Sequence, residues 1–435
     1  MMPKNESSSD FKAAIITNQI AERTEIPEPL SSFSNRDIES YQYSSVNPET
    51  GLRLLQLREL QANHSFWGNS LFRAFNKGNL SLSDLQFVFG QYSFYSRNFT
   101  RYLAGFMANS ANDMHRAQLV ENLWEESGET HLNERHAELF RRFLTQGLGI
   151  SLNNLAPIPA TQIFVKEVLS FCLQSPPRDS SAFLSLGMEG IVARMYKIFI
   201  KGLKLAGIPD NHLTFFHLHT ACDDEHAVTL ENIMTSYANE PGWFEACCRA
   251  LTFALDLREQ FFENLYQQLQ VGRIKPLLER IQARKSLADP QQTRVISGGQ
   301  SGMLLYQNEG IWGKQSIEFT VERFVLPTEV LDPRLVRIAP NKTNERHRHA
   351  HEALFLIKEG QGTVWIDQEQ FDVEIGDLVF IPRWSVHQVR NTGDSLLVIL
   401  AITDFGLTSK AFVGNYLKTA RMQMTQDADY IHLSS

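Results

Sequence analysis

Residues 215–234 read FFHLHTACDDEHAVTLENIM, and this stretch decides the fold of the first part of the chain. Its apolar residues recur at helical spacing, so we expect a single helix. Because each residue of a helix turns by about 100°, His219, Asp223 and His226 share one stripe of its surface. Apolar neighbours place that stripe against a core, where a carboxylate between two imidazoles is costly unless a cation neutralises it. A polar face of an ordinary helix is the plainer interpretation, but three ligand-type side chains in this register favour a metal site.

Helical spacing continues on both sides of this stretch, from Leu52 to about Ser286. Residues 52–75 predict one amphipathic helix. The next helix has Ser81 or Ser83 as its N-cap. It carries an aromatic series whose helical spacing predicts core packing: Phe87, Phe89, Tyr92, Phe94, Tyr95 and Phe99. With no strand pattern in this half, the first domain is predicted to be all-α.

Two further segments of this half bring acidic and imidazole side chains into helices. A helix that contains Glu126 is interrupted near Gly128, and another begins before His136. Residues 180–207 predict a long helix in which Glu189 lies among apolar neighbours. A carboxylate in such a setting is either paired or a metal ligand.

From about residue 290 the pattern changes to short apolar or alternating runs separated by Gly, Pro and Asn, which predicts an antiparallel sheet or barrel. The runs are SIEFTVERFVL, RLVRIA, EALFLIKEGQGTVWID, EQFDVEIGDLVFIP, SVHQVRN and LLVILAI, and residues 287–297 form the predicted linker. The predicted organisation is therefore a multidomain chain, α and then β: a flexible N-terminal tail (1–48), an all-α domain (49–288), a β domain (289–420) and a C-terminal tail (421–435).

The β half carries a second group of imidazoles, in RHRHAHEALFLIKEGQG (346–362) and GDLVFIPRWSVHQVRN (376–391). Alternate residues of a strand share a face, so His347 and His349 can both enter a barrel and meet His387 from another strand. Three imidazoles suit Fe(II) and leave coordination positions open for dioxygen and substrate. The plainer interpretation is a metal-free barrel used for packing or ligand sensing.

Composition narrows the possible classes of protein. The chain has 435 residues, a formal charge of -8 without a basic block, and no apolar run long enough for a membrane span. We therefore expect neither nucleic acid nor a membrane as a partner. The four cysteines form no C-x-x-C pair, and the first residues contain no secretion signal, so we expect a soluble, cytoplasmic protein.

The β half resembles the cupin superfamily. Its paired motifs are matched by His347 and His349, by Gly360, and by the second-motif residues Gly376, Pro382, His387 and Asn391. The position of the usual cupin glutamate ligand is occupied here by Ala353. Glu352 would point to the opposite face of the strand, whereas His351 shares the inward face but ranks below the three histidines.

The helical half resembles the haem-oxygenase-like di-iron oxidases and oxygenases, which bind no haem. The resemblance implies six iron ligands: Glu126, His136, Glu189, His219, Asp223 and His226. Glu125 or Glu129 could replace Glu126, and His131 could replace His136. Three carboxylates and three imidazoles are a sensible set for two ferrous ions.

The order of the two domains is similar to that of N-nitrosourea-forming synthases. This resemblance implies two Fe(II) in the helical domain, one in the cupin, and dioxygen as co-substrate. The di-iron site would oxygenate an amine or guanidine nitrogen of an amino-acid-derived substrate such as N-methyl-arginine, and the cupin iron would rearrange the product towards an N-nitroso or related N–N bonded compound. Two alternatives remain: a di-iron oxidase that cleaves C–C bonds or decarboxylates an amino or fatty acid, and a cupin that only binds ligands.

The sequence also bears on the partners of the reaction. No G-x-G-x-x-G fingerprint of a flavin or nicotinamide site is evident, so an external electron donor is implied. We also expect a homodimer.

Overall fold

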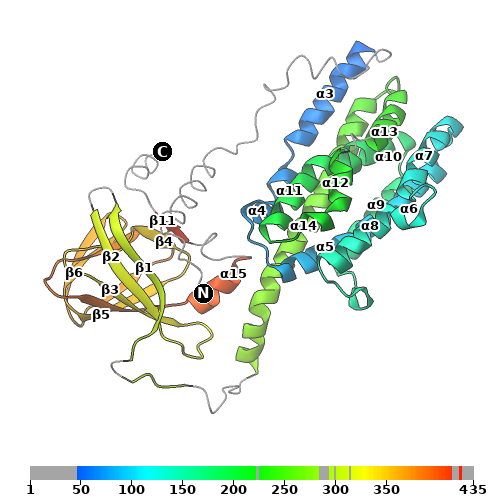
Figure 1. Ribbon diagram of the computed structural model, residues 1–435. Coiled ribbons are helices and arrows are strands. Elements are labelled where there is room, and N and C mark those ends of the chain that lie inside the picture. Colours follow the sequence, from blue (N-terminus) through cyan, green and yellow to red (C-terminus); the bar gives the residue numbers. More distant parts are fainter. Residues whose placement is uncertain are drawn as a thin grey trace. The chain divides into compact units, whose positions relative to one another are not determined.

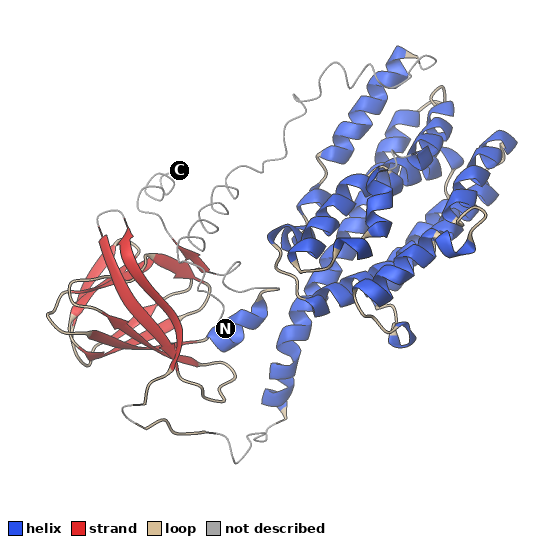
Figure 2. Ribbon diagram, in the orientation of Figure 1, coloured by secondary structure: helices blue, strands red, loops and turns tan. Residues whose placement is uncertain are grey.

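The computed structural model describes residues 47–221, 225–283, 293–297, 300–312, 315–413 and 421–423. Helices fill the chain from Pro48 to Gln282, and strands begin at Met303, which confirms the predicted order of an α part followed by a β part (Figures 1 and 2). The predicted tail 1–48 and the predicted boundary at 288/289 lie almost wholly outside the described residues. Within the described ranges, no helix is both long and apolar enough to cross a membrane.

The helical part consists of short and medium helices followed by one long helix. In chain order they are α3 (Pro48–Ala62), η2 (Ser65–Gly68), α4 (Ser70–Lys77), α5 (Leu82–Ser96), α6 (Phe99–Asn109), α7 (Asp113–Glu126), η3 (Leu132–Glu134), α8 (His136–Arg142), η4 (Phe143–Gly147), η5 (Leu152–Asn154), α9 (Pro159–Gln174), α10 (Pro177–Leu184), η6 (Ser185–Glu189), α11 (Val192–Leu205), η7 (Asp210–His212), α12 (Thr214–Ala221), α13 (Glu225–Ser236) and α14 (Trp243–Gln282).

The predicted single helix over 52–75 is wrong, because α3 ends at Ala62 and α4 begins at Ser70. Side chains that cap helices cause the break. Nδ1 of His64 accepts the backbone N–H of Phe66 at 3.1 Å, and the Asn69 side chain accepts the N–H of Phe72 at 2.9 Å. Further along, Ser81 caps α5 as predicted, in a reciprocal capping box with Asp84.

The helix expected over 180–207 also differs from the prediction, whereas the single helix expected over 215–234 is not tested, because its middle lies outside the described residues. The structure has three elements over 180–207 in place of one regular helix. They are α10, the π-helical turn η6 and α11. The stretch 215–234 is described as α12 and α13, and residues 222–224 between them lie outside the described part of the chain. Of the apolar residues predicted to face the core, Leu218 is 38% exposed.

Aromatic side chains form much of the core of the helical part. Every member of the predicted series on α5 and α6 is buried except Phe87, which is half-buried. Phe89 lies at their centre, with ring centroids 5.1 Å from Phe143 and 5.4 Å from Phe199. Such edge-to-face pairs stabilise the core beyond the area that they bury.

The β part forms two facing sheets. The strands are β1 (Met303–Trp312), β2 (Gln315–Arg323), β3 (Asp332–Ile338), β4 (His347–His349), β5 (Ala353–Glu359), β6 (Gly362–Ile366), β7 (Glu369–Val373), β8 (Leu378–Ile381), β9 (His387–Asn391), β10 (Leu397–Thr403) and β11 (Arg421–Gln423), with the helix α15 (Phe405–Ala411). The sheet orders are β1-β2-β3-β10-β5-β8 and β11-β4-β9-β6-β7. Buried apolar residues from both sheets, such as Phe319, Ile338, Val364 and Leu397, form one core.

Two strands, β1 and β11, were not predicted from the sequence. β1 pairs with β2 over its whole length, and β4, the strand predicted to carry His347 and His349, is only three residues long. β11 comes from residues 421–423, which the prediction assigned to the C-terminal tail, and it pairs with β4. Such short strands are defined by their hydrogen-bonding neighbour and not by a local pattern.

Candidate metal centres

The end of α7 and the start of α8 bring the first two candidate ligands together. α7 ends at Glu126 and α8 begins at His136. Between them Gly128 has a φ of +79°, and a Cβ there would lie 2.6 Å from the carbonyl oxygen of His131 and from the backbone nitrogen of Arg135. Only glycine fits this turn, which returns the chain to Glu126.

Glu126, His136 and His219 form one group in which each residue offers a ligand atom within 4.8 Å of the others. Nδ1 of His136 lies 3.0 Å from Oε1 of Glu126 and 3.1 Å from Nε2 of His219. Nδ1 of His219 lies 2.7 Å from the carbonyl oxygen of Phe215. Because a carbonyl oxygen only accepts, Nδ1 of His219 carries the proton and Nε2 carries the lone pair that a metal needs.

Glu126, Glu189 and His226 form a second group that meets the same 4.8 Å limit. His226 lies between two carboxylates, with Nδ1 3.5 Å from Oε1 of Glu126 and Nε2 2.5 Å from Oε2 of Glu125. Asn122 on α7 donates to the backbone carbonyl of His226 at 3.3 Å. These contacts hold the start of α13 against the end of α7.

Glu126 therefore belongs to both groups, and it is only 7% exposed. A carboxylate has two oxygens, so one buried side chain can serve two neighbouring cation positions. Two three-residue groups that share a carboxylate are the arrangement expected for a binuclear site in a helical bundle.

The charges of the metal-free cluster are strongly coupled. Burial opposes the charge on Glu126, but the imidazoles of His136 and His226 hold the pKa of this carboxyl well below its usual value. Against the effect of burial, Glu126 in turn raises the pKa of His136. Burial also opposes the charge on His226, yet Glu126 and Glu189 raise its pKa to about 9. Burial, helped by the charge on His136, lowers the pKa of His219 to about 4.

Glu189 reaches the cluster from the last residue of the π-helical turn. The N–H of Gly190 donates to the carbonyl of Ser185 at 2.7 Å, which closes the wide turn. A Cβ on Gly187 would lie 2.2 Å from Cβ of Ala254 on α14, so the turn packs directly on that helix. π-turns are frequent at functional sites because they redirect one side chain.

The structure distinguishes among the alternatives that the sequence left open. Glu129 and His131 are exposed, whereas Glu126 and His136 lie in the cluster, and Glu125 joins it through His226. Asp223 lies outside the described residues. The assignment of these side chains as iron ligands stays a prediction.

The histidines of the β part also converge. His347 on β4 is in register with His387 on β9. Ring centroids are 4.4 Å apart for His347 and His387 and 4.7 Å for His349 and His387, and one ligand atom from each residue lies within 4.8 Å of the others.

Backbone carbonyls orient all three rings. Nδ1 of His347, His349 and His387 lies 2.9 Å from the carbonyl oxygens of Glu345, His351 and Ser385, respectively. Each ring in its neutral form therefore carries its proton on Nδ1 and its lone pair on Nε2. This hydrogen bond to a carbonyl is typical of imidazoles that bind a metal through the other nitrogen.

The neighbours of these histidines lie as strand parity predicts. Ala353 is buried, and Glu352 is exposed, with its carboxylate 3.5 Å from Arg383. His351 is buried and stacks on His349 with ring centroids 3.5 Å apart. The donor set is therefore three imidazoles, each of which in its neutral form offers Nε2, and such a set fits a divalent transition metal.

A fourth group, His64, Asp256 and Glu259, also satisfies the distance limit. Here the N–H of Phe66 donates to Nδ1 of His64, so the proton of the neutral ring lies on Nε2, 3.3 Å from Oδ1 of Asp256. Neither ring nitrogen offers a lone pair to a cation. We interpret this group as a helix cap tied to α14.

Sequence reasoning missed Arg258, which is fully buried on α14 and contacts Met188, the residue before Glu189. The available signal was its register, because it follows Leu251 and Leu255 and precedes Phe262 at the spacing of an apolar helix face. A charged residue on that face is rare unless it has a specific partner.

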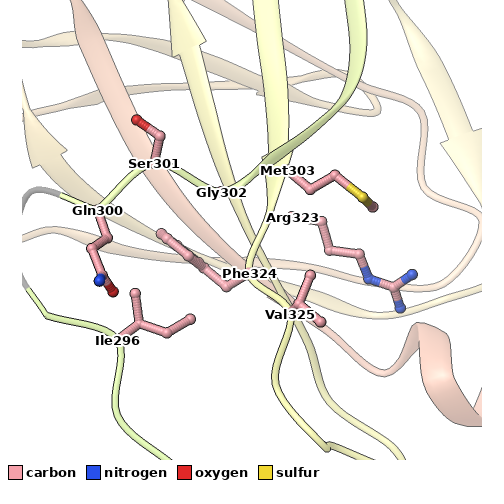
Figure 3. A pocket seen from close by; sticks show the side chains of 8 residues that line it. All are labelled: Ile296, Gln300, Ser301, Gly302, Met303, Arg323, Phe324 and Val325. Atoms are coloured by element: carbon pink, nitrogen blue, oxygen red, sulfur yellow. The ribbon is translucent and has the colours of Figure 1, made fainter. Parts of the chain in front are cut away.

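The β part also has a surface pocket of about 320 Å³ (Figure 3). Residues just before β1, at its first position, and at and just after the end of β2 line it: Ile296, Gln300, Ser301, Gly302, Met303, Arg323, Phe324 and Val325. No candidate ligand is among them, so the pocket is separate from the metal chemistry.

Comparison with curated relatives gives short matches. A 5-nitrosalicylic acid 1,2-dioxygenase of Bradyrhizobium sp is 34% identical over 70 residues, which are 16% of this chain and 34% of the relative. An uncharacterised protein of Aquifex aeolicus is 41% identical over 63 residues, 14% of this chain and 51% of the relative. The chain thus spans a third to a half of the length of these relatives.

Two of the solved structures that the chain resembles each cover only a share of it. A CADD-like protein of unknown function from Nostoc punctiforme aligns with 51% of this chain and 99% of its own, at 21% identity and a TM-score of 0.46. A cupin 2 conserved barrel domain protein from Rhodopseudomonas palustris aligns with 23% of this chain and 71% of its own, at 23% identity and a TM-score of 0.21.

Two family models match the chain, and each covers one group of candidate ligands. Residues 86–259 match the family described as iron-containing redox enzymes, and residues 334–403 match the cupin domain. The chain therefore carries a haem-oxygenase-like, iron-containing redox enzyme domain at 86–259, followed by a cupin domain at 334–403.

Proposed function

We propose that this chain is a non-haem iron oxygenase with two metal centres, which N-oxygenates an amino-acid-derived amine or guanidine and then rearranges the product. The observation that carries the proposal is the sharing of Glu126 between two ligand groups, beside a separate three-histidine group. Ferrous iron held in these groups would activate dioxygen for insertion into an N–H bond.

In the helical domain, Glu126 would contribute to both Fe(II) positions. His136 and His219 would complete one position, and Glu189 and His226 the other. The low pKa of His219 leaves its Nε2 lone pair available to a metal, the pKa of His226 means that this ring must lose a proton first, and the raised pKa of His136 opposes metal binding at that ring. Glu125 lies beside His226 as acceptor for that proton, and Asp223 is proposed as a further ligand.

In the cupin domain, His347, His349 and His387 would hold one Fe(II). Three neutral ligands leave its charge uncompensated, which favours a substrate that binds through an anionic group. An N-hydroxylated guanidine supplies such a group when its hydroxyl is deprotonated. On this proposal the cupin converts the hydroxylated product towards an N-nitroso or related N–N bonded compound.

The proposal also names the partners of the reaction. They are dioxygen, an amino-acid-like substrate such as N-methyl-arginine, and an external electron donor. We further propose a homodimer, which light scattering on the purified full chain would test.

Incubation of iron-loaded protein with N-methyl-arginine, reductant and dioxygen tests whether the helical centre carries out the oxygenation and the cupin centre the rearrangement. Wild-type protein should give the rearranged product, and His349→Ala should accumulate a substrate that has gained oxygen mass. His136→Ala should stop oxygenation altogether, and the matched control His131→Ala, at an exposed histidine, should behave as wild type. If His349→Ala also stops the first oxygenation, the two centres do not act in sequence.

A second candidate is C–C cleavage or decarboxylation of an amino or fatty acid at the di-iron site, with the cupin as a ligand-binding module. The aromatic side chains around His219 favour it, since the Phe215 ring lies 4.4 Å and the Tyr196 ring 5.6 Å from this imidazole. Iron analysis separates the candidates: three irons per chain favour two catalytic centres, and two favour a metal-free cupin.

A further inference from the structure

Arg258 is a buried cation whose hydrogen-bond partners are neutral. It is 0% exposed. Nη2 donates to the hydroxyl of Tyr95 at 2.5 Å and to the carbonyl of Met188 at 3.3 Å, and the guanidinium lies 4.6 Å from the centre of the Tyr95 ring. The sulfur atoms of Met188 and Met195 lie 3.1 and 3.8 Å from Nε and Nη1.

A buried guanidinium stays protonated, so it needs a negative charge nearby. Tyr95 does not supply it, because burial raises the pKa of this phenol well above its usual value. The charge of Glu189 reaches both Tyr92 and Tyr95, the phenols that flank Arg258.

The contacts of Arg258 also bear on the backbone that carries Glu189. Met188, which Arg258 holds by both its carbonyl and its sulfur, is the residue directly before Glu189 in the π-helical turn. One turn earlier on α14, Ala254 packs against Gly187. Two consecutive residues of the turn are therefore held by one face of α14.

We propose that Arg258 is a positioning residue of the di-iron centre, which clamps Met188 so that Glu189 presents its carboxylate to the position shared with Glu126 and His226. This inference rests on the proposed function, because it assigns Glu189 to one of two metal positions. The group of Glu126, His136 and His219 does not include Glu189 and should not depend on Arg258.

The test is anaerobic loading of the full chain with ⁵⁷Fe(II), followed by iron counting and Mössbauer spectroscopy. Wild-type protein should hold three irons. Arg258→Met should bind one of the two helical-domain irons at least tenfold more weakly, with its quadrupole doublet lost and the cupin iron retained as an internal reference. Arg258→Lys, which keeps the charge, should recover part of this binding. Arg249→Met, at an exposed arginine of the same helix, is the matched control and should bind three.

A second pair of variants tests the clamp without touching Arg258. Gly187→Ala should lose the same iron, because its Cβ would collide with Ala254, and the double variant Gly187→Ala with Ala254→Gly should regain it. If Arg258→Met does not fold, as judged by circular dichroism, iron binding by this pair of variants and by Arg258→Lys tests whether the contacts with α14 position Glu189.

The possible failures are distinguishable. Three irons with unchanged doublets in both Arg258→Met and Gly187→Ala would overturn this inference and leave the proposed function standing. Wild-type protein that holds iron in the cupin alone would overturn the proposed function, and the inference with it.

Discussion

Glu126 is the residue on which both helical metal positions depend. It is buried, it pairs with His136 and faces His226, and its pKa is held low by them. The same carboxylate thus has two roles: it favours the protonated forms of His136 and His226 in the metal-free protein, and it would contribute to both metal positions in the loaded one.

Replacing this carboxylate should therefore affect both states. Glu126→Gln should abolish both helical-domain irons, and in chelated protein it should cost about 3 kcal/mol, because the protonated forms of two half-buried imidazoles, His136 and His226, lose their partner. Denaturant unfolding and iron analysis measure the two effects. Glu129→Gln, at an exposed carboxylate, is the control. Retention of both irons in Glu126→Gln would show that this carboxylate does not serve both metal positions.

The histidines predict a bell-shaped stability profile for the metal-free protein. Above an ordinary pKa of 6.5, unfolded His226 loses its proton while folded His226 keeps it to about pH 9, so stability falls as pH rises. Below pH 6.5, His219 binds a proton in the unfolded protein, whereas in the folded protein it stays unprotonated down to about pH 4. Stability therefore falls as pH falls.

Stability should therefore be greatest near pH 6.5 and should fall by about 2 kcal/mol towards pH 9, since one pKa unit is worth about 1.4 kcal/mol. Urea unfolding of chelated protein across this range is the measurement. His226→Gln should flatten the alkaline side. A stability that climbs steadily with pH would contradict the assignment of the protons.

At the scale of elements, turns and helix ends place Glu126, His136 and Glu189, whereas His219 lies within α12. The turn after α7 returns the chain through Gly128, and the π-helical turn after α10 redirects Glu189. Both turns interrupt regular helical hydrogen bonding, and the packing around them offsets the energetic cost of the irregular backbone.

The turn at Gly128 provides a matched pair of variants. Gly128→Ala places a Cβ 2.6 Å from two backbone atoms at a φ of +79°, so it should destabilise the fold by about 2 kcal/mol or more and weaken iron binding through His136. Gly149→Ala has a similar φ of +67° but open space around the Cβ, so it should cost about 1 kcal/mol and leave iron binding unchanged. Denaturant unfolding with iron titration compares them, and equal effects would show that the turn does not position His136.

At the scale of the whole molecule, the two ligand sets come from separate parts of the chain. The helical groups use residues 125–226, and the cupin group uses residues 347–387. Loss of metal at one centre should therefore leave the other centre filled.

This independence predicts additive iron contents. Glu126→Gln should retain the cupin iron, His349→Ala the two helical irons, and the double variant none, as measured by iron analysis of protein loaded under anaerobic conditions. Loss of helical iron in His349→Ala would show that the centres are coupled.

Periodicity along the sequence was enough to predict the α part, the β part and most strands, because an amphipathic pattern is a local property. It was also enough to identify His219, His226, Glu189 and the three cupin histidines as candidate ligands. Side-chain type and the face of a helix or strand on which a residue lies both follow from the sequence. Helix continuity was predicted less well. His64 and Asn69 end or begin helices through their own side-chain hydrogen bonds, which compete with the backbone pattern.

Tertiary structure decided what depends on residues far apart in the chain. It brought Glu126 into both groups, left Glu129 and His131 exposed, and buried Arg258 against Met188. Local periodicity gives the face of a helix on which a side chain lies, whereas distances between helices follow from how their side chains fill the core. For that reason the sequence by itself predicted the types of side chain that could bind metal, and only the tertiary structure decided which of these acids and imidazoles lie together.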